Sequence, residues 1–143
     1  MMIRVVEASD LLEVLQIEYA VFKFPYPPDL VNFLYANYRE TFLVADIGGI
    51  KGFLIAIYDE EEGHILSIAV RDDCRDLGIG KALMGHIMSF LREQAVPLIR
   101  LEVRKGNARA ISFYEGLGFR RTEHLPEYYE DGEAAYVMIK HIR

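Results

Sequence analysis

Hydrophobic and polar positions follow two different periods along the chain, and each change of period marks the end of an element. The leucines of residues 11–15, and Tyr19 after them, fall at helical spacing, and Ser9 before them is a residue type that favours helix N-caps. Three prolines within residues 25–28 must end this helix, because proline lacks the backbone N–H that a helix needs. Residues 29–38 predict a second helix directly after the last proline.

Shorter apolar runs predict three consecutive strands over residues 41–47, 51–58 and 64–70. The glycine pair at 48–49 favours a tight hairpin between the first two strands. The acidic run 59–62 between the second and third strands is typical of a solvated turn.

Strands and helices alternate in the rest of the chain. Apolar residues recur every four positions from Ile79 to Leu91 and predict a helix with one broad apolar face. The order β-α-α-β-β-β-α-β-α-β-β predicts an α/β protein with helices on a mixed central sheet, in one domain over residues 1–143. The remaining elements are a strand at 2–7, a strand at 98–103, a helix at 108–117 with Gly118 as its left-handed cap, and strands at 119–124 and 133–141.

Composition and charge exclude several classes of partner. Hydrophobic residues make up 52% of the 143 positions, yet no apolar run approaches the ~20 residues of a membrane span. A net charge of −6 argues against nucleic acid or an anionic membrane as a partner. Cys74 is the only cysteine, which fits a reducing compartment, and we expect a cytoplasmic protein. The four histidines lack metal-ligand spacing, so no metal is expected. One local basic cluster is conceivable, formed by Arg100, Arg104, Lys105 and Arg109.

The stretch "VRDDCRDLGIGKALMGHI" at 70–87 joins a strand to a helix through a glycine-rich loop. Free N–H groups at the helix N-terminus attract anions, and glycines let a phosphate come close to the backbone. Arg75 adds a charge-assisted donor, so a pyrophosphate is the natural ligand. The loop lacks the P-loop motif and the dinucleotide motif G-x-G-x-x-G. From the residues alone, a glycine-rich helix entry without a ligand is an equal interpretation.

Four ordered motifs resemble the GCN5-related N-acetyltransferases, the GNAT family. "RDLGIG" at 75–80 resembles the R/Q-x-x-G-x-G/A motif that holds the pyrophosphate of acetyl-coenzyme A (acetyl-CoA), and "GHILSIAV" at 63–70 resembles the strand before it. "LEVRKGNARAISFYEGLGF" at 101–119 is similar to the second conserved block, and "EYYEDGEAAYVM" at 127–138 to the C-terminal hairpin of N-terminal acetyltransferases. The resemblance implies the GNAT fold, with about seven strands and about four helices. It points to the ribosomal-protein-alanine and archaeal N-terminal acetyltransferases.

The resemblance implies three catalytic residues. Glu102 matches the family's general base, and His64 matches a histidine that can share this role. Tyr114 matches the acid that protonates the coenzyme A thiolate. From the residues alone, Glu102 can also be a surface carboxylate or a partner of Arg104, His64 a structural or solvated histidine, and Tyr114 a core aromatic.

The resemblance also implies acetyl-CoA as cosubstrate, without a metal. Asn107 would bind the pantetheine region, although it is also a natural helix N-cap. The Val70 N–H would be the oxyanion donor if the strand carries the family's bulge. The full set implied to bind the coenzyme is Ile68, Ala69, Val70, Arg75, Asp76, Leu77, Gly78, Ile79, Gly80, Lys81 and Asn107.

Tyrosines in two loops are candidates for binding the acceptor. Tyr26 lies in the proline-rich break, where "FPYP" is loosely similar to the family's substrate loop, and Tyr128 and Tyr129 lie in the last hairpin. The alternative for each is an ordinary loop aromatic. The sequence therefore predicts direct acetyl transfer in a ternary complex to a protein N-terminal amine, by a monomer or homodimer. The alternatives are acetylation of a small amine or an internal lysine, and a non-catalytic acyl-CoA sensor.

Overall fold

The computed structural model describes residues 1–143 and contains seven strands and four helices in the predicted order. The strands form one sheet in the order β1-β2-β3-β4-β5-β7-β6, in which β4 and β5 are parallel. The predicted mixed sheet is thereby confirmed. The elements are β1 (Met2–Val5), α1 (Leu11–Val21), α2 (Pro28–Asn37), β2 (Phe42–Asp46), β3 (Ile50–Tyr58), β4 (Gly63–Val70), α3 (Ile79–Glu93), β5 (Leu98–Arg104), α4 (Ala108–Gly116), β6 (Arg120–Leu125) and β7 (Ala135–His141).

The chain divides into two compact units. One unit contains Met1–Ile57 and Leu66–Phe90, and the other contains Tyr58–Ile65 and Leu91–Arg143. The prediction of a single domain over residues 1–143 stays a prediction.

The first unit has its own apolar core, built by α1, α2, β2 and β3. Both helices bury one face against the sheet, and the Phe42 and Phe53 rings lie 6.5 Å apart between the two strands. Burying such side chains contributes about 1.5–3 kcal/mol each, so this core stabilises the unit. The fully or almost fully buried members from the helices are Val14, Ile17, Val31 and Leu34.

Helix α1 differs from its predicted pattern in two ways. Leu12 and Tyr19 are 69% and 60% exposed, because the buried face runs through residues 14, 17 and 18 instead. Ser9 does not cap the helix. A turn of 3-10 helix at Ala8–Asp10 precedes α1, and the Glu7 N–H donates to the Asp10 carboxylate at 2.8 Å.

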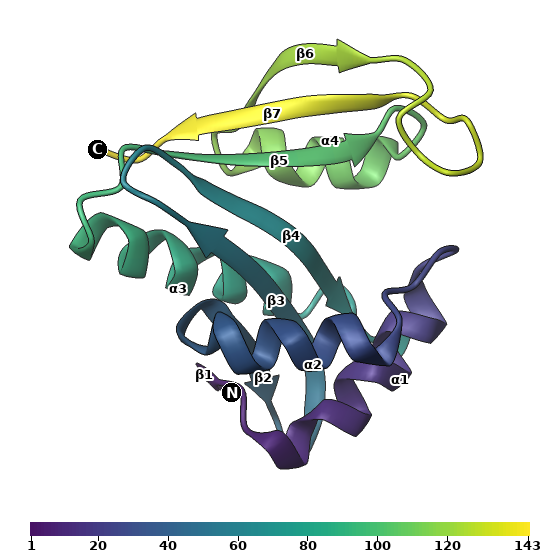
Figure 1. Ribbon diagram of the computed structural model, residues 1–143, viewed down its shortest axis with the longest axis vertical. Coiled ribbons are helices and arrows are strands. Elements are labelled where there is room, and N and C mark those ends of the chain that lie inside the picture. The colour runs from purple at the N-terminus through teal and green to yellow at the C-terminus, as the bar shows by residue number, and fades with distance from the viewer. The chain divides into compact units, whose positions relative to one another are not determined.

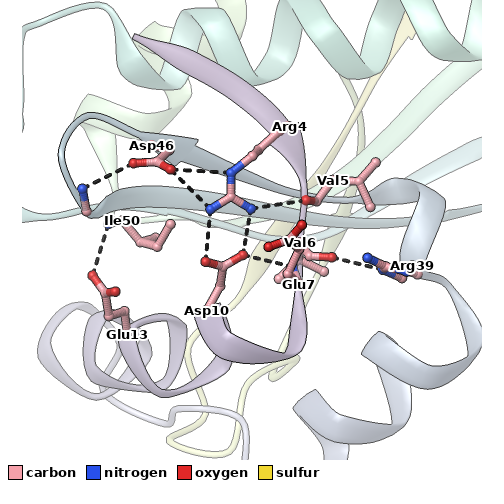
Figure 2. A network of polar contacts seen from close by, with 10 residues as sticks. Arg4, Val5, Val6, Glu7, Asp10, Glu13, Arg39, Asp46 and Ile50 are labelled. Atoms are coloured by element: carbon pink, nitrogen blue, oxygen red, sulfur yellow. Dashed lines mark hydrogen bonds and ion pairs between the residues drawn. The ribbon is translucent and has the colours of Figure 1, made fainter.

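A polar network holds the start of α1 to the first strands (Figure 2). The Arg4 guanidinium donates to both oxygens of Asp10, at 2.7 and 2.9 Å, and to Asp46 at 3.1 Å. The side chain of Glu13 accepts the Ile50 N–H at 3.0 Å. Arg4 lowers the pKa of Asp10, which therefore keeps its charge and its bonds at neutral pH. The network joins β1, α1 and the β2–β3 hairpin.

Glycines take up the predicted turn conformations at both hairpin and helix ends. Gly48 and Gly49 have φ of +66° and +123° between β2 and β3, and Gly118 has φ of +96° after α4. The predicted apolar face of α3 is confirmed, because Ile79 and Leu91 and the residues between them at that spacing are buried.

The second unit presents a three-stranded antiparallel arrangement in which β7 pairs with both β5 and β6 (Figure 1). Helix α4 lies along one side of these strands. The start of β4 adds a parallel pairing in which His64 lies opposite Arg100. Alternation along β5 then places Arg100, Glu102 and Arg104 on one face of this strand, and Leu101 and Val103 on the other.

Candidate active site

Two predicted catalytic residues meet on β4 and β5. The His64 Nε2 lies 2.7 Å from the Glu102 Oε1, across 38 positions of sequence. Their side chains are 18% and 11% exposed, so the pair is largely shielded but reachable from solvent. A bond of this length between an imidazole and a carboxylate is charge-assisted and fixes the orientation of the ring.

Arg100 completes this cluster, and the sequence analysis missed it. Its Nη1 donates to the Glu102 Oε2 at 2.7 Å, and its Nε donates to the Glu62 Oε2 at 2.9 Å. Arg104, the alternative partner that the sequence allowed for Glu102, forms its ion pairs with Asp131 and Glu133. The sequence did place Arg100 and Arg104 alike, each two positions from Glu102 on the same face of β5. Only the pairing of β5 with β4 distinguishes the two arginines.

The cluster corrects two predictions from composition. Arg100 and Arg104 do not form a basic patch, because each is engaged by carboxylates. The run 59–62 is a turn, held by the Asp59 side chain, which accepts the N–H groups of residues 61 and 62. It is not merely solvated, because Glu62 extends from it to Arg100.

The neighbours of Glu102 decide its charge. Burial by itself would raise the pKa of Glu102. The hydrogen bond from His64 and the positive charge of Arg100 outweigh burial, and they hold this pKa below its ordinary value. Glu102 is therefore a carboxylate at neutral pH, with one oxygen accepting from His64 and the other from Arg100.

The predicted acceptor tyrosines of the last hairpin lie beside this cluster. The Tyr128 hydroxyl donates to the Glu102 Oε1 at a long 3.4 Å, and its ring meets that of Tyr129 edge to face at 5.0 Å. The Arg104 guanidinium lies 4.1 Å from the centre of the Tyr129 ring. The structure thus places the Tyr128 hydroxyl against the predicted base, Glu102, and the Tyr129 ring against the Tyr128 ring.

Arg104 also fastens the loop that carries these tyrosines. Its Nη1 donates to Asp131 at 3.0 Å and to Glu133 at 2.8 Å. The other oxygen of Glu133 accepts the Gly106 N–H at 3.0 Å. One arginine therefore links the end of β5 to the β6–β7 loop by two ion pairs and one ring contact.

Tyr114 and Asn107 both have the structural positions that the sequence allowed, a buried aromatic and a helix N-cap. Tyr114 is 8% exposed in α4 and its ring packs edge to face on Phe119, 5.8 Å away. Burial raises the pKa of Tyr114 well above its ordinary value, so its hydroxyl keeps its proton. The Asn107 side chain caps α4 by accepting the Ala110 N–H at 3.1 Å.

The other candidate acceptor residue, Tyr26, lies in the first unit. Its hydroxyl donates to the Leu66 carbonyl at 3.1 Å, and its N–H donates weakly to Glu18 at 3.5 Å. Glu18 is 1% exposed and also accepts from the Ser67 hydroxyl at 3.3 Å. The sequence analysis missed Glu18, although its spacing from Val14 places it on the buried face of α1.

The glycine-rich loop has the backbone of an anion site. Asp76 and Gly78 have φ of +64° and +80°, and the first bond of α3 runs from the Ala82 N–H to the Gly78 carbonyl. The N–H groups of residues 79–81 therefore have no partner within the helix. Arg75 pairs with Asp72 at 3.0 Å, and Lys81 is exposed. Before this loop, residues 68–70 form the end of β4.

The remaining candidates, a nucleophilic cysteine, a metal site and a membrane span, have little support. The Cys74 thiol donates to Asp73, and burial together with this carboxylate raises its pKa, so it is a poor nucleophile at neutral pH. Histidines, cysteines and carboxylates do not gather into a group that could hold a metal ion. None of the helices combines the length and apolar character that crossing a bilayer requires.

Comparisons with known proteins agree on one family. A family model described as Acetyltransferase (GNAT) family matches residues 9–119. An uncharacterized N-acetyltransferase of Methanocaldococcus jannaschii is 42% identical over 98% of this chain and 91% of its own length. The ribosomal protein bS18-alanine N-acetyltransferase of Escherichia coli strain K12 is 32% identical over 92% of this chain and 91% of its own length. The crystal structure of Ard1 from Thermoplasma volcanium matches with a TM-score of 0.94 and 35% identity, over 99% of this chain and 97% of that chain.

Proposed function

Because this chain belongs to the GNAT acetyltransferase family, we propose that it transfers an acetyl group from acetyl-CoA to the α-amine at a protein N-terminus. The observation that carries the proposal is the 2.7 Å contact between His64 and Glu102, with Tyr128 beside it. The name of the Escherichia coli relative supports the acceptor. Alanine has no nitrogen in its side chain, so an alanine N-acetyltransferase acting on a protein modifies an α-amine.

The residues of the glycine-rich loop fit the coenzyme. Three N–H groups without helical partners, at 79–81, match the needs of a pyrophosphate, and the open backbone at Gly78 lets it approach. When bound, acetyl-CoA supplies the thioester carbonyl that the amine attacks and the thiolate that leaves. Arg75 and Lys81 add positive charge, residues 68–70 offer backbone groups to the pantetheine arm, and Asn107 offers its amide.

We assign the proton of the amine to His64. The Glu102 carboxylate engages Nε2, so a neutral ring carries its hydrogen there and its lone pair on Nδ1, which accepts from the Arg100 Nη2 at 3.3 Å until the amine takes its place. Glu102 itself is a weak base, because its pKa is low and both its oxygens are engaged. An α-amine has a reference pKa of about 7.7–8.0, so a neutral imidazole is strong enough to accept its proton. Glu102 orients the ring, which reverses the order that the sequence suggested.

The leaving thiolate needs a proton, and Tyr114 is the proposed donor. Its buried hydroxyl stays protonated at working pH because its pKa is raised. The balance is complete: the N–C bond forms, the C–S bond breaks, His64 Nδ1 gains the amine proton, and the Tyr114 proton goes to sulfur.

The acceptor peptide is the proposed ligand of Tyr26, Tyr128 and Tyr129. Each presents an apolar ring and a hydroxyl, which suits a peptide backbone next to an amine. Their bonds to Leu66 and to Glu102 hold two of these rings in place before a peptide arrives.

Mass spectrometry of peptides tests the proposal. The peptides carry either a free or a blocked N-terminus, each with an internal lysine, and are incubated with the enzyme and acetyl-CoA. We expect acetylation of the free N-terminus alone. Transfer to lysine or only to small amines would overturn the proposed acceptor, and coenzyme binding without transfer to any amine would indicate a sensor.

A further inference from the structure

The side chain of Glu133 holds two segments of the second unit at once. One of its oxygens accepts from the Arg104 guanidinium at 2.8 Å, and the other accepts the Gly106 N–H at 3.0 Å. Glu133 lies in the β6–β7 loop (residues 126–134), and Gly106 lies in the turn between β5 and α4 (residues 105–107). Both segments lie at the same end of this unit (Figure 1). The carboxylate therefore joins a loop and a turn that are far apart in the sequence.

Each of these two segments carries a residue that the proposed reaction uses. Asn107, the proposed ligand of the coenzyme, follows Gly106 directly and caps α4. Tyr129, a proposed ligand of the acceptor, donates its N–H to the Glu133 carbonyl at 3.1 Å. The Tyr129 ring also lies on the same Arg104 guanidinium that binds Glu133. One glutamate is thus next to a residue of each proposed substrate site.

We propose that Glu133 is a positioning residue for both substrates, because it fixes the turn with Asn107 and the loop with Tyr129 on β5. The bonds from Arg104 and from the Gly106 N–H hold the pKa of Glu133 below its ordinary value, so the carboxylate is present at neutral pH. The inference rests on the proposed function where it takes Asn107 and Tyr129 as substrate ligands. The contacts of Glu133 themselves do not depend on that function.

Other bonds hold the β6–β7 loop without help from the Glu133 side chain. The Gly132 N–H donates to the Tyr129 carbonyl at 2.9 Å. Asp131 pairs with Arg104 separately, at 3.0 Å. Removal of the Glu133 carboxylate should therefore loosen the loop without unfolding the protein.

Gly106→Ala breaks the same contact from the opposite side and leaves Glu133 itself unchanged. A Cβ on Gly106 would lie 2.7 Å from the Glu133 Oε2, which is too close for the carboxylate to stay in place. This oxygen is the end of a flexible side chain, and Gly106 lacks the positive φ that would strain an alanine. The substitution should therefore displace the carboxylate at little cost to the fold.

Amide hydrogen exchange, followed by mass spectrometry, tests this link in protein without substrates. We expect residues 105–110 and 128–134 to exchange about two- to tenfold faster in Gly106→Ala and in Glu133→Ala, the factor that one lost hydrogen bond represents. Glu133→Gln keeps an oxygen that can accept from one donor, so its exchange should lie between those of the original and of Glu133→Ala. Unchanged exchange of both segments in Gly106→Ala and in Glu133→Ala would overturn the inference.

Two matched controls separate this contact from the general effect of each substitution. Gly116→Ala makes the same change at an exposed glycine of α4, where an added Cβ meets no atom within 4 Å. Glu130→Ala removes an exposed glutamate from the same loop. Both segments should exchange no faster in these controls than in the original, and equal acceleration in controls and test variants would overturn the inference.

Steady-state kinetics test the role of the link in the reaction. In Gly106→Ala we expect KM for acetyl-CoA and KM for the peptide both to rise about two- to tenfold, with kcat within about twofold of the original. A purely structural role would lower kcat with the folded fraction and leave both KM values in place. Faster exchange with unchanged KM values would overturn the positioning of substrates. Faster exchange in a protein whose original form acetylates no peptide would overturn the proposed function and leave the link itself standing.

Discussion

Two glutamates that are largely shielded from solvent, one in each unit, have opposite electrostatics. Glu18 is 1% exposed, and its neighbours, the Ser67 hydroxyl and the Tyr26 N–H, are neutral. Burial therefore raises its pKa to about 7. Glu102 is also shielded, but His64 and Arg100 hold its pKa below the ordinary value. The difference shows that a cation and an imidazole, not burial, decide which carboxylate stays charged.

This difference distinguishes a carboxyl that can serve as a neutral hydrogen-bonding group from one that stays an anion. A carboxyl that is half protonated near pH 7 serves as a neutral hydrogen-bonding group as readily as an anion. Glu102 keeps a fixed charge, which can stabilise an imidazolium while His64 holds a proton. Changing each glutamate to its neutral isostere should therefore have opposite consequences.

The largest effect is expected on the rate of acetyl transfer. Glu102→Gln removes the charge that orients His64 and stabilises its protonated form, and kcat should fall by roughly 10²–10⁴-fold. Steady-state kinetics with acetyl-CoA and a peptide with a free N-terminus measure this. Glu123→Gln, the same change on the exposed strand β6, should leave kcat within about twofold. A Glu102→Gln enzyme within tenfold of the original would contradict the assignment.

The second effect is on stability and its dependence on pH. The folded pKa of Glu18, about 7, lies above its unfolded value of 4.5, so the native state binds more protons between these values. The free energy of unfolding should therefore fall as pH rises through this window, by up to ~3 kcal/mol. Glu18→Gln should remove this loss. Urea unfolding from pH 4 to 8 compares the two proteins.

If the free energy of unfolding changes equally with pH in the original and in Glu18→Gln, the pKa of Glu18 is not raised, and the contrast with Glu102 is wrong. Glu13→Gln does not serve as a control, because Glu13 accepts the Ile50 N–H. Glu61→Gln does, since its side chain is exposed in the 59–62 turn.

The third effect has the opposite sign in pH. The folded pKa of Glu102 is depressed, so its stabilisation is present above the unfolded value of 4.5 and is lost as pH falls through the folded value. Glu102→Gln should be less stable than the original by about 1 kcal/mol at pH 7. The gap should close in acid, where both side chains are uncharged. The same urea series measures it, and a gap that widens in acid would be the contrary result.

The smallest effect belongs to Tyr128. Its bond to Glu102 is long, at 3.4 Å, and its ring is half exposed. Tyr128→Phe keeps the ring that packs on Tyr129 and should raise KM for the peptide about two- to fivefold with little change in kcat. Peptide-dependence kinetics measure this. A large fall in kcat would instead place the Tyr128 hydroxyl in the proton transfer.

The sequence predicted elements better than partners. Periodicity found every strand and helix because it reflects burial, and it failed in α1 where Leu12 is exposed and Glu18 is buried. The prediction assigned the buried i, i+3, i+4 positions to leucines. The helix instead buries the Glu18 carboxyl on this face, where it accepts a hydrogen bond from the Ser67 hydroxyl.

The candidate site was predicted from motifs, and its electrostatics were not. Motifs placed His64, Glu102 and Tyr128 in the same reaction, and the structure brings them within hydrogen-bonding reach. The contacts of Arg100 were not predicted, because they depend on the register of β4 against β5, which places His64 opposite Arg100. Register is a long-range property, and local spacing does not contain it.

The ion pairs of Arg104 have a consequence for the thermodynamics of binding. A loop that orders only when a peptide arrives costs conformational entropy at that moment, about 1–2 kcal/mol for each residue fixed. Here Asp131 and Glu133 are already tied to β5, and Tyr129 already rests on the guanidinium. The ordering cost has been met during folding, so the acceptor should bind with a small entropic penalty and with an affinity that depends on few contacts.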